Sequence, residues 1–518
     1  MKDRIAVDAV ETRSAHITPL IVNCFGLIAG AYTLLHDIFI VYHVDAFLNG
    51  FAISPLSFTV SEIVFLIWNT LNDPLFGYLS DREILTRSMS LVGIVHKRCK
   101  LIIYSSMLFC VSFAFIWQNS LLFSYPGIRF GVSLCLYDTA LTMLNLQHDS
   151  LLADLAITQH DRSVLGSRSS LFQCIGAIGV VLLSYISPTA SVPGQSGLDP
   201  NFTVFCYFIS IVVLLLLLFS TTQIKNIFQD SAEAQELVKL KIKPNPKTIE
   251  VIPTLIESKQ EKPISKNCNT STFRMLFLMM RRPNFVWFSV LYFLQVFHCH
   301  FNSNFFPLFS RYLLGQDQQA LISALVAMSF MMPHLNNMLL LNLAQDIGLY
   351  WVVMGLLLAK VGMALVTFVC GYQSLFFISV FIASNRMFTE GVCKLLAQVI
   401  SDLVDEDMVL SGRKSPVSAL VFGCAALVSR PGQTVAPIFG IMVLHCLAGV
   451  SYSAVSSQSG MSILDHASDV SWDIMETSCF ILSTLVAIVT GTMQLFAWSQ
   501  YKLHGSYLAY IKQKRQAI

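Results

Sequence analysis

The sequence contains few charged residues, and this scarcity excludes most classes of soluble protein. Asp, Glu, Lys and Arg together make up 12% of the 518 residues, whereas about 25% is usual in soluble globular domains. Hydrophobic residues make up 54% of the chain, and the formal net charge is only +2. A charge this small indicates no nucleic-acid partner. The composition therefore predicts a polytopic membrane protein whose immediate surroundings are the lipid bilayer.

Motifs of catalysis, metal binding and disulfide frameworks are also absent. The sequence has no HExxH, GxSxG or phosphate-binding glycine loop, so we predict that the protein is not an enzyme. An intramembrane enzyme that uses paired acids is the alternative. None of the 13 cysteines belongs to a CxxC pair, which argues against a disulfide framework. His298, Cys299 and His300 are consecutive, but adjacent residues point in different directions on a helix, so we expect neither a bound metal nor another cofactor.

Long apolar segments dominate what is present. A bilayer core of about 30 Å takes about 20 mainly apolar residues per helix. Twelve segments meet this test, at 17–44, 58–79, 101–122, 128–156, 168–187, 201–222, 284–310, 319–341, 349–370, 373–400, 416–448 and 474–499. They form two groups of six, so we predict an all-α membrane protein of two six-helix bundles.

The predicted domains follow from this grouping. Residues 1–222 form an N-terminal six-helix bundle, and residues 284–518 form a C-terminal bundle with a tail. The stretch 223–283 between them is rich in Lys, Pro, Ser and Asn, a composition typical of a mostly disordered linker.

The distribution of basic residues predicts the orientation. Lys and Arg gather after even-numbered segments, in the linker and in the C-terminal tail, for example Arg87, Lys100 and Lys414. The positive-inside rule then places both termini and the linker in the cytosol. Asn201, in the sequence NFT, faces outside and is a candidate glycosylation site, although its closeness to a span argues against its use. We expect a monomer in the plasma membrane.

Polar residues recur on single faces of the predicted spans. Each ionisable group at the bilayer centre costs about 2.5–3.5 kcal/mol on insertion scales, so such groups usually face an interior or a water-filled cavity. At 100° per residue, Asn69 and Asp73 share one face of the second segment, and Asp138 and Thr142 share one face of the fourth. The second segment has no Lys or Arg, and Arg129 sits only at the edge of the fourth, so Arg430 in the eleventh segment is the candidate partner.

Two further stripes lie in the C-terminal half. His298 and Asn302 share a face of the seventh segment. In the tenth segment Arg386, Glu390 and Lys394 are spaced i, i+4, i+8, so that Glu390 could pair with both cations. This ladder either neutralises itself within the bundle or takes a direct part in substrate binding or gating.

The polar stretch of the second segment resembles a family signature. "WNTLNDPLFGYLSDR", at 68–82, is similar to the helix 2 motif of the glycoside–pentoside–hexuronide:cation symporters, which belong to the major facilitator superfamily. "HDSLLADLAITQHDRSVLGSRSSLFQ" and "DLVDEDMVLSGRKSPVSALVFG" resemble that family's connections between helices 4 and 5 and between helices 10 and 11. The order of these matches across both halves implies the major facilitator fold.

The resemblance also implies roles for individual residues. Asn72 and Asp73 match the family's coupling-ion site, to which Asn69 also belongs by position. Asp138 matches a sugar-binding aspartate, and Arg430 stands where the family has a lysine. The cytosolic gate is then expected at Gly77, Asp81, Arg82 and Arg413.

Departures from the family pattern bear on the cargo. Asn69 replaces a carboxylate of the cation site, which leaves Asp73, and burial favours the protonated form of a lone carboxylate. We therefore expect coupling to H⁺ rather than Na⁺. Ala29 stands in place of a sugar-binding aspartate, and Thr142 in place of a tryptophan.

The resulting hypothesis is a secondary transporter that works by alternating access. The resemblance implies a small, carbohydrate-like solute. It would bind near the following residues: Asp37, Asp138, Thr142, His298, Asn302 and Arg430. The alternatives are a lysolipid or amphiphile transporter on the same fold and a non-transporting membrane receptor or scaffold.

Overall fold

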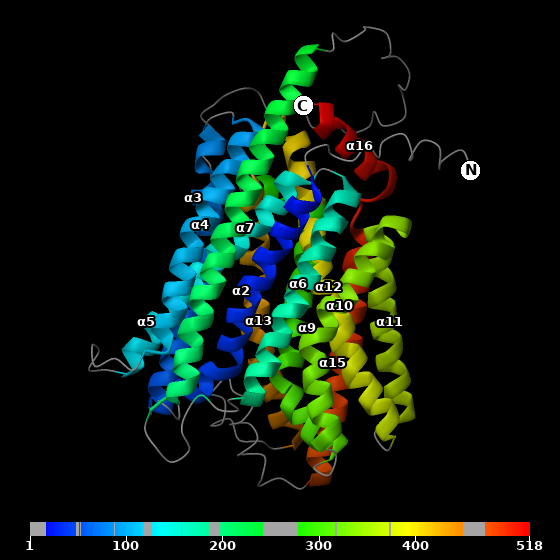
Figure 1. The fold of residues 1–518 in the computed structure, drawn as a ribbon. Helices are drawn as coiled ribbons and strands as arrows, with labels where there is room; N and C mark the ends of the chain where they lie inside the picture. Colours follow the sequence, from blue (N-terminus) through cyan, green and yellow to red (C-terminus); the bar gives the residue numbers. More distant parts are fainter. Residues whose placement is uncertain are drawn as a thin grey trace.

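The computed structural model consists of long helices. It describes residues 17–47, 51, 53–86, 89–118, 126–156, 158–186, 190, 197–241, 278–315, 319–371, 374–448 and 472–517. This part of the chain contains thirteen helices (Figure 1). The first six are α2 (Pro19–Asp45), α3 (Pro55–Thr86), α4 (Leu91–Ile116), α5 (Pro126–Leu155), α6 (Gln159–Ile186) and α7 (Pro200–Lys241). The others are α9 (Pro283–Leu314), α10 (Gln319–Ile347), α11 (Leu349–Cys370), α12 (Leu375–Leu410), α13 (Ser418–Ala448), α15 (Trp472–Gln500) and the short α16 (Gly505–Ala517).

Local sequence signals set several helix starts. Thr18 caps α2, accepting a hydrogen bond on its side-chain oxygen from the Ile21 amide at 3.3 Å, and Ser90 caps α4 by accepting one from the Gly93 amide at 3.2 Å. Proline opens α2, α3, α5, α7 and α9, because its missing N–H and fixed φ suit the first turn of a helix.

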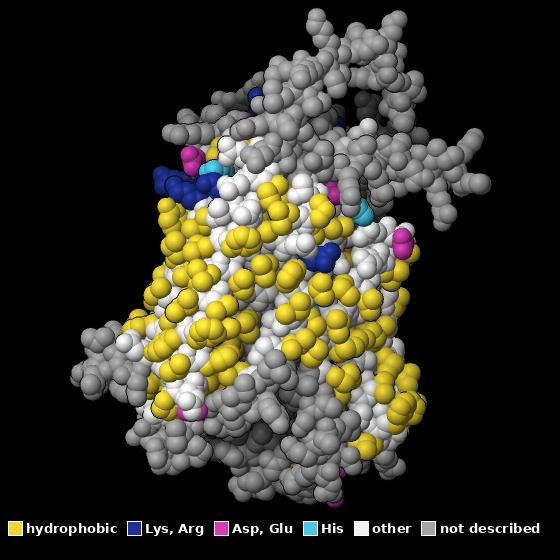
Figure 2. All heavy atoms as spheres, viewed as in Figure 1, with side chains coloured by type: hydrophobic (Ala, Val, Ile, Leu, Met, Phe, Trp, Pro, Cys, Tyr) yellow, Lys and Arg dark blue, Asp and Glu magenta, His cyan; other side chains and the backbone are white. Residues whose placement is uncertain are grey.

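Hydropathy separates the twelve long helices into two kinds. Seven of them, α2, α4, α7, α11, α12, α13 and α15, are long and apolar enough to cross a membrane by length and composition alone. The other five, α3, α5, α6, α9 and α10, do not meet this test, and each carries buried polar side chains. Figure 2 shows hydrophobic side chains covering the viewed face between its two ends, as expected of a surface in contact with lipid.

The helices form the two predicted bundles. In the first bundle α2 packs against α6 and α7, and in the second α9 packs against α13 and α15. The bundles meet where α3 contacts α13 and α6 contacts α10. The twelve-helix major facilitator arrangement predicted from the sequence is thereby confirmed. The predicted linker starts inside α7, which continues to Lys241, and residues 242–277 lie outside the described part of the chain.

The two bundles are packed together at one end. We call this end, where α2 begins and α16 lies, the α16 end (Figure 1). A single hydrophobic cluster there combines Ile84 and Leu146 of the first bundle with Leu403 and Leu420 of the second. A separate cluster, which includes Phe305 and Phe309, fills the second bundle toward the opposite end. The hydrophobic contact between the bundles therefore belongs mainly to the α16 end.

Two glycines allow α3 and α13 to touch there. A Cβ atom on Gly77 would lie 2.4 Å from the carbonyl oxygen of Ala419, and one on Gly423 would lie 2.6 Å from the carbonyl oxygen of Asp73. Both distances are below any normal contact, so a larger side chain at either position would force the two helices apart.

We expect Gly77→Ala to lower the thermal stability of the purified protein, because the added methyl group costs about 1–3 kcal/mol when it overpacks such a contact. The measurement is the temperature at which the monodisperse chromatographic peak is lost on heating. Gly355→Ala is the matched control, because no atom lies within 4 Å of a Cβ built at that helical position. Equal stability of the two variants would contradict the close approach of α3 and α13.

Candidate functional site

A cavity of about 380 Å³ lies between the bundles near the middle of the long helices. Side chains of both bundles line it, and its charged residues are Asp73, Asp149, Lys394 and Arg430. Two histidines, His148 and His300, and several amide and aromatic side chains complete the wall. A small polar solute is the ligand that such a lining suits, because convergent polar groups on a partly apolar wall fix a ligand's orientation.

An ion pair joins the bundles at this cavity. Arg430 Nε donates to Asp73 Oδ2 at 2.9 Å, across the contact between α13 and α3. The Asp73 side chain is 8% exposed, whereas that of Arg430 is 31% exposed. The guanidinium therefore retains surface that faces the cavity while the carboxylate is nearly covered. The structure thus brings together the two residues whose pairing the sequence suggested.

The other predicted coupling-ion residues lie beside this pair. Asn72 Nδ2 donates to Asp138 Oδ2 at 2.5 Å and lies 3.4 Å from Thr142 Oγ1. Asn69 is buried, and its Oδ1 atom has no hydrogen-bond partner within the described residues. Asp138 and Thr142 thus contact α3 behind the cavity wall.

Aromatic rings position His148, the histidine of the first bundle that lines the cavity. His148 on α5 stacks on Phe25 of α2 with ring centroids 4.0 Å apart, and its Nε2 atom lies 3.1 Å from the Phe25 carbonyl oxygen. Tyr32, about two helical turns further along α2, meets the same imidazole edge-on at 5.8 Å. These contacts give the cavity one rigid aromatic side.

The tenth-segment ladder does not form within α12. Glu390 Oε1 accepts a hydrogen bond from the Cys299 thiol at 3.0 Å, and Lys394 Nζ donates to Gln173 Oε1 of the first bundle at 3.4 Å. The Arg386 guanidinium lies 5.4 Å from the centre of the Phe306 ring. The ion pairs between described residues include none of these three side chains. Lys394 is the member that reaches the cavity.

A buried arginine closes the α16 end. Arg162, at the start of α6, donates from Nη1 to Asp402 Oδ1 at 2.6 Å and from Nη2 to Asp405 Oδ2 at 2.7 Å, both on α12. Its side chain is 0% exposed, as is that of Asp405. Gln398 adds a hydrogen bond to the Arg162 carbonyl oxygen at 2.9 Å. This cluster lies between the cavity and the α16 end, so it separates the cavity from that side.

A second buried arginine organises the predicted gate. Arg98 of α4 contacts Asp81 at 2.7 Å and Asp154 at 2.9 Å. Asp81 also accepts a hydrogen bond from the Leu420 amide at 2.9 Å, which joins the first bundle to α13. Ser418 donates across the same interface to Asp154. Asp81 is therefore at the closed end, as the sequence suggested, but its partner is an arginine that the sequence analysis did not single out.

The two predicted gate arginines, Arg82 and Arg413, also lie at this end. The Arg82 side chain is exposed. Arg413 pairs with Asp407 within the second bundle, and Arg282 contacts the same carboxylate at 3.3 Å.

The C-terminal helix covers the closed end. Arg515 pairs with Asp405 of the second bundle and donates to the Ala153 carbonyl oxygen of the first at 2.9 Å. Lys512 lies 3.3 Å from Asp402. Burial lowers the pKa of the Lys512 amine, and the neighbouring Asp402 carboxylate opposes that shift. Thus α16 supplies two further cations to the carboxylates that Arg162 binds.

Three further predicted binding residues, like Asp138 and Thr142, lie outside the lining of the cavity, so Arg430 is the one predicted binding residue within it. His298 Nδ1 is 3.1 Å from Lys360 Nζ inside the second bundle. Asn302 is buried against α12, where Asn385 donates to its Oδ1 atom at 3.2 Å. Asp37 is half-buried on α2. Helical periodicity placed His298 and Asn302 on one face correctly, but that face meets α11, α12 and α15.

Lys360 is a buried charged residue of the second bundle that the sequence analysis missed. It lies in the middle of α11, is 1% exposed, and donates to Gln494 Oε1 as well as contacting His298. Gln494 in turn donates to Gln295 at 2.8 Å. A lysine within a segment otherwise free of acidic and basic side chains was the signal that could have found this network.

Comparisons with known proteins identify the family. A family model described as "MFS/sugar transport protein" matches residues 19–249 and 247–471. Transmembrane protein 180 of Gallus gallus is 36% identical over 507 residues, which cover 95% of this chain and 94% of that protein. Transmembrane protein 180 of Mus musculus is 36% identical over 513 residues, with coverages of 95% and 94%.

Solved structures agree on the fold. A bacterial homologue of the iron transporter ferroportin in an outward-facing state aligns with a TM-score of 0.58 at 12% identity, covering 93% of this chain and 100% of that one. The E. coli fucose:proton symporter FucP aligns with a TM-score of 0.51 at 14% identity, covering 92% and 99%.

These findings define a major facilitator fold with a polar cavity between its bundles, which is the architecture of a secondary transporter. The chain belongs to the MFS/sugar transport protein family, and its similarity to transmembrane protein 180 extends over nearly its whole length.

Proposed function

We propose that the protein carries a small polar, carbohydrate-like solute across the membrane by alternating access, coupled to H⁺. The observation that carries this proposal is the polar cavity between the bundles, which the Arg162 cluster closes at the α16 end. A cavity of about 380 Å³ is at the lower end of the range for ligand pockets, about 300–1,000 Å³. It therefore suits a small solute.

Solute contacts are assigned to side chains that line this cavity. Arg430 and Lys394 supply cationic donors, Asp149 supplies a carboxylate, and Gln173 and Tyr32 supply groups that can bond hydroxyls. Asp138 and Thr142 support the wall from behind through Asn72. The structural neighbours are a homologue of an iron transporter and a fucose:proton symporter, so the fold by itself does not select the solute.

Proton coupling is assigned to the Asp73–Arg430 pair. Protonation of Asp73 would release Arg430 toward the cavity, and deprotonation would recapture it. A Na⁺ ion needs several oxygen ligands, yet the Asp73 carboxylate is already paired with the Arg430 guanidinium. H⁺ is therefore the better candidate.

An amphiphile carrier and a non-transporting receptor or scaffold remain the competing hypotheses. A carrier for amphiphiles needs an apolar wall for the chain, whereas charged and amide side chains make up much of this cavity's lining. A scaffold would need no enclosed polar cavity at all.

Uptake by proteoliposomes separates these functions. Purified full-length protein would be tested with labelled monosaccharides, disaccharides, small anions and lysophosphatidylcholine. We expect accumulation of a polar solute above that of protein-free liposomes, and its loss in Arg430→Gln. Uptake of the lysolipid alone would establish the amphiphile carrier, and absence of uptake for every class would contradict transport.

We also propose that the protein lies in the plasma membrane with both termini in the cytosol, which makes the closed α16 end the inner side. Epitope tags at Met1 and Ile518 are expected to be hidden in intact cells, because the basic loops favour the cytosol. A tag within 450–472, most of which lies outside the described residues, is expected to be accessible. Antibody labelling before and after permeabilisation is the measurement. Labelling of both terminal tags in intact cells would reverse the orientation.

A further inference from the structure

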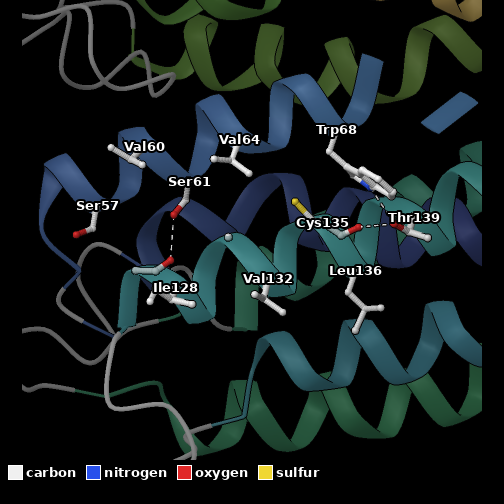
Figure 3. A pocket seen from close by; sticks show the side chains of 12 residues that line it. Ser57, Val60, Ser61, Val64, Trp68, Ile128, Val132, Cys135, Leu136 and Thr139 are labelled. Carbon is white, nitrogen blue, oxygen red and sulfur yellow. Dashed lines mark hydrogen bonds between the residues drawn. The ribbon is translucent and has the colours of Figure 1, made fainter. Parts of the chain in front are cut away.

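A groove between α3 and α5 is separate from the central cavity. Its volume is about 870 Å³. Figure 3 shows side chains from both helices along its length, with Val60 and Val64 on α3 and Val132 and Leu136 on α5. The valines are 48–54% exposed, so the groove opens to the surroundings of the molecule.

Small residues bring the two helices close together along this groove. A Cβ atom on Gly127 would lie 2.6 Å from Ser57 Cβ, and one on Gly131 would lie 3.2 Å from Ser61 Oγ. Larger side chains at these positions would separate the helices and fill the space. The groove is therefore formed by the way α3 and α5 pack against each other.

The polar side chains of the groove, Ser57, Ser61, Trp68 and Thr139, make hydrogen bonds within the protein. Ser61 Oγ donates to the Gly127 carbonyl oxygen at 3.0 Å, and Trp68 Nε1 donates to Thr139 Oγ1 at 2.9 Å (Figure 3). Thr139 Oγ1 itself donates to the Cys135 carbonyl oxygen at 2.7 Å. What remains along the wall is mainly hydrocarbon, which favours an apolar occupant.

The length of the groove matches one leaflet. Ser57 lies near the start of α3, and Trp68 lies near its middle. At 1.5 Å per residue this stretch is about 16 Å long, and half of a hydrocarbon core of about 30 Å is about 15 Å. The Trp68–Thr139 hydrogen bond joins the two helices at the inner end of the groove.

We propose that this groove binds one acyl chain of a phospholipid from the leaflet at the end opposite α16. The lipid is a resident ligand that fills the space between α3 and α5. It is distinct from the transported solute, and the proposal does not depend on the proposed function.

Lipid retention and photo-crosslinking test the proposal on the full-length protein. The probe is a phosphatidylcholine with a photoreactive diazirine in one acyl chain. We expect cross-linked peptides from residues 57–68 and 127–139, and one phospholipid retained on the protein in native mass spectrometry after delipidation.

Val64→Trp should occupy the groove and reduce cross-linking by about tenfold, because displacing two buried methylenes changes binding by that factor. Val111→Trp on α4 is the matched control, because Val111 is also exposed, at 63%, and does not line the groove. Cross-links spread evenly over α4 and α7, or no effect of Val64→Trp, would overturn the proposal. So would preferential labelling by a photoreactive sterol, or a dimer that Val64→Trp dissociates, since each would identify a different occupant.

Discussion

Replacing Arg162 with glutamine is expected to open the α16 end of the protein. The guanidinium is fully buried and binds Asp402 at 2.6 Å and Asp405 at 2.7 Å, so its loss leaves two buried carboxylates without their main partner. Breaking a buried ion pair costs about 3–5 kcal/mol. Because Lys512 and Arg515 still contact these acids, we expect a cost near 3 kcal/mol, which is about a hundredfold in the equilibrium between closed and open ends.

Hydrogen–deuterium exchange in lipid nanodiscs measures this change. Backbone amides in 398–412 should exchange faster in Arg162→Gln than in the wild type. Arg82→Gln is the control, because Arg82 lies at the same end with an exposed side chain. The Asp402→Asn and Asp405→Asn changes, added to Arg162→Gln, should recover yield if the single variant folds poorly. Unchanged exchange in Arg162→Gln, or an equal increase in Arg82→Gln, would show that the Arg162 cluster does not hold this end closed.

Neutralising Asp73 is expected to separate accumulation from exchange. In Asp73→Asn the amide imitates the protonated carboxyl group, so Arg430 is released permanently and no proton can be gained or lost there. Uptake driven by a pH gradient should then fall to equilibration, with a concentration ratio of about 1 instead of the roughly tenfold ratio that one H⁺ per solute sustains across one pH unit. Exchange of internal for external solute should persist, because it requires no net movement of protons.

Proteoliposomes loaded with the solute found in the uptake screen provide the measurement. Asp73→Glu is the conservative comparison, since it keeps an ionisable carboxyl group near Arg430. Replacement of Na⁺ by choline at constant pH should leave wild-type uptake unchanged. A clear dependence on Na⁺ would contradict proton coupling and would assign the ion to oxygen ligands near Asp138. Full accumulation by Asp73→Asn would make the Asp73–Arg430 pair purely structural.

The sequence by itself determined the membrane class, the twelve long helices and their division into two bundles. Each of these depends on local properties: apolar length, proline and serine at helix starts, and basic residues between segments. The stretch at 68–82 also placed Asp73 and Asp81 correctly on α3. It even suggested Arg430 as a partner for an acid, because a buried charge in a membrane span requires one.

Only the tertiary structure decided which faces meet. The stripe of His298 and Asn302 has the same period whether it faces a cavity or a neighbouring helix, and it meets Lys360 and Asn385 inside the second bundle. Glu390 has the right spacing to pair with the two cations on its own helix. In the structure, however, its carboxylate accepts a hydrogen bond from Cys299 on α9, and Lys394 donates to Gln173 on α6. Arg162 and Asp402 are 240 residues apart, and no local pattern connects them. Periodicity fixes the direction of a side chain relative to its own helix, whereas the partner it finds depends on how the helices pack, which is a property of the whole chain.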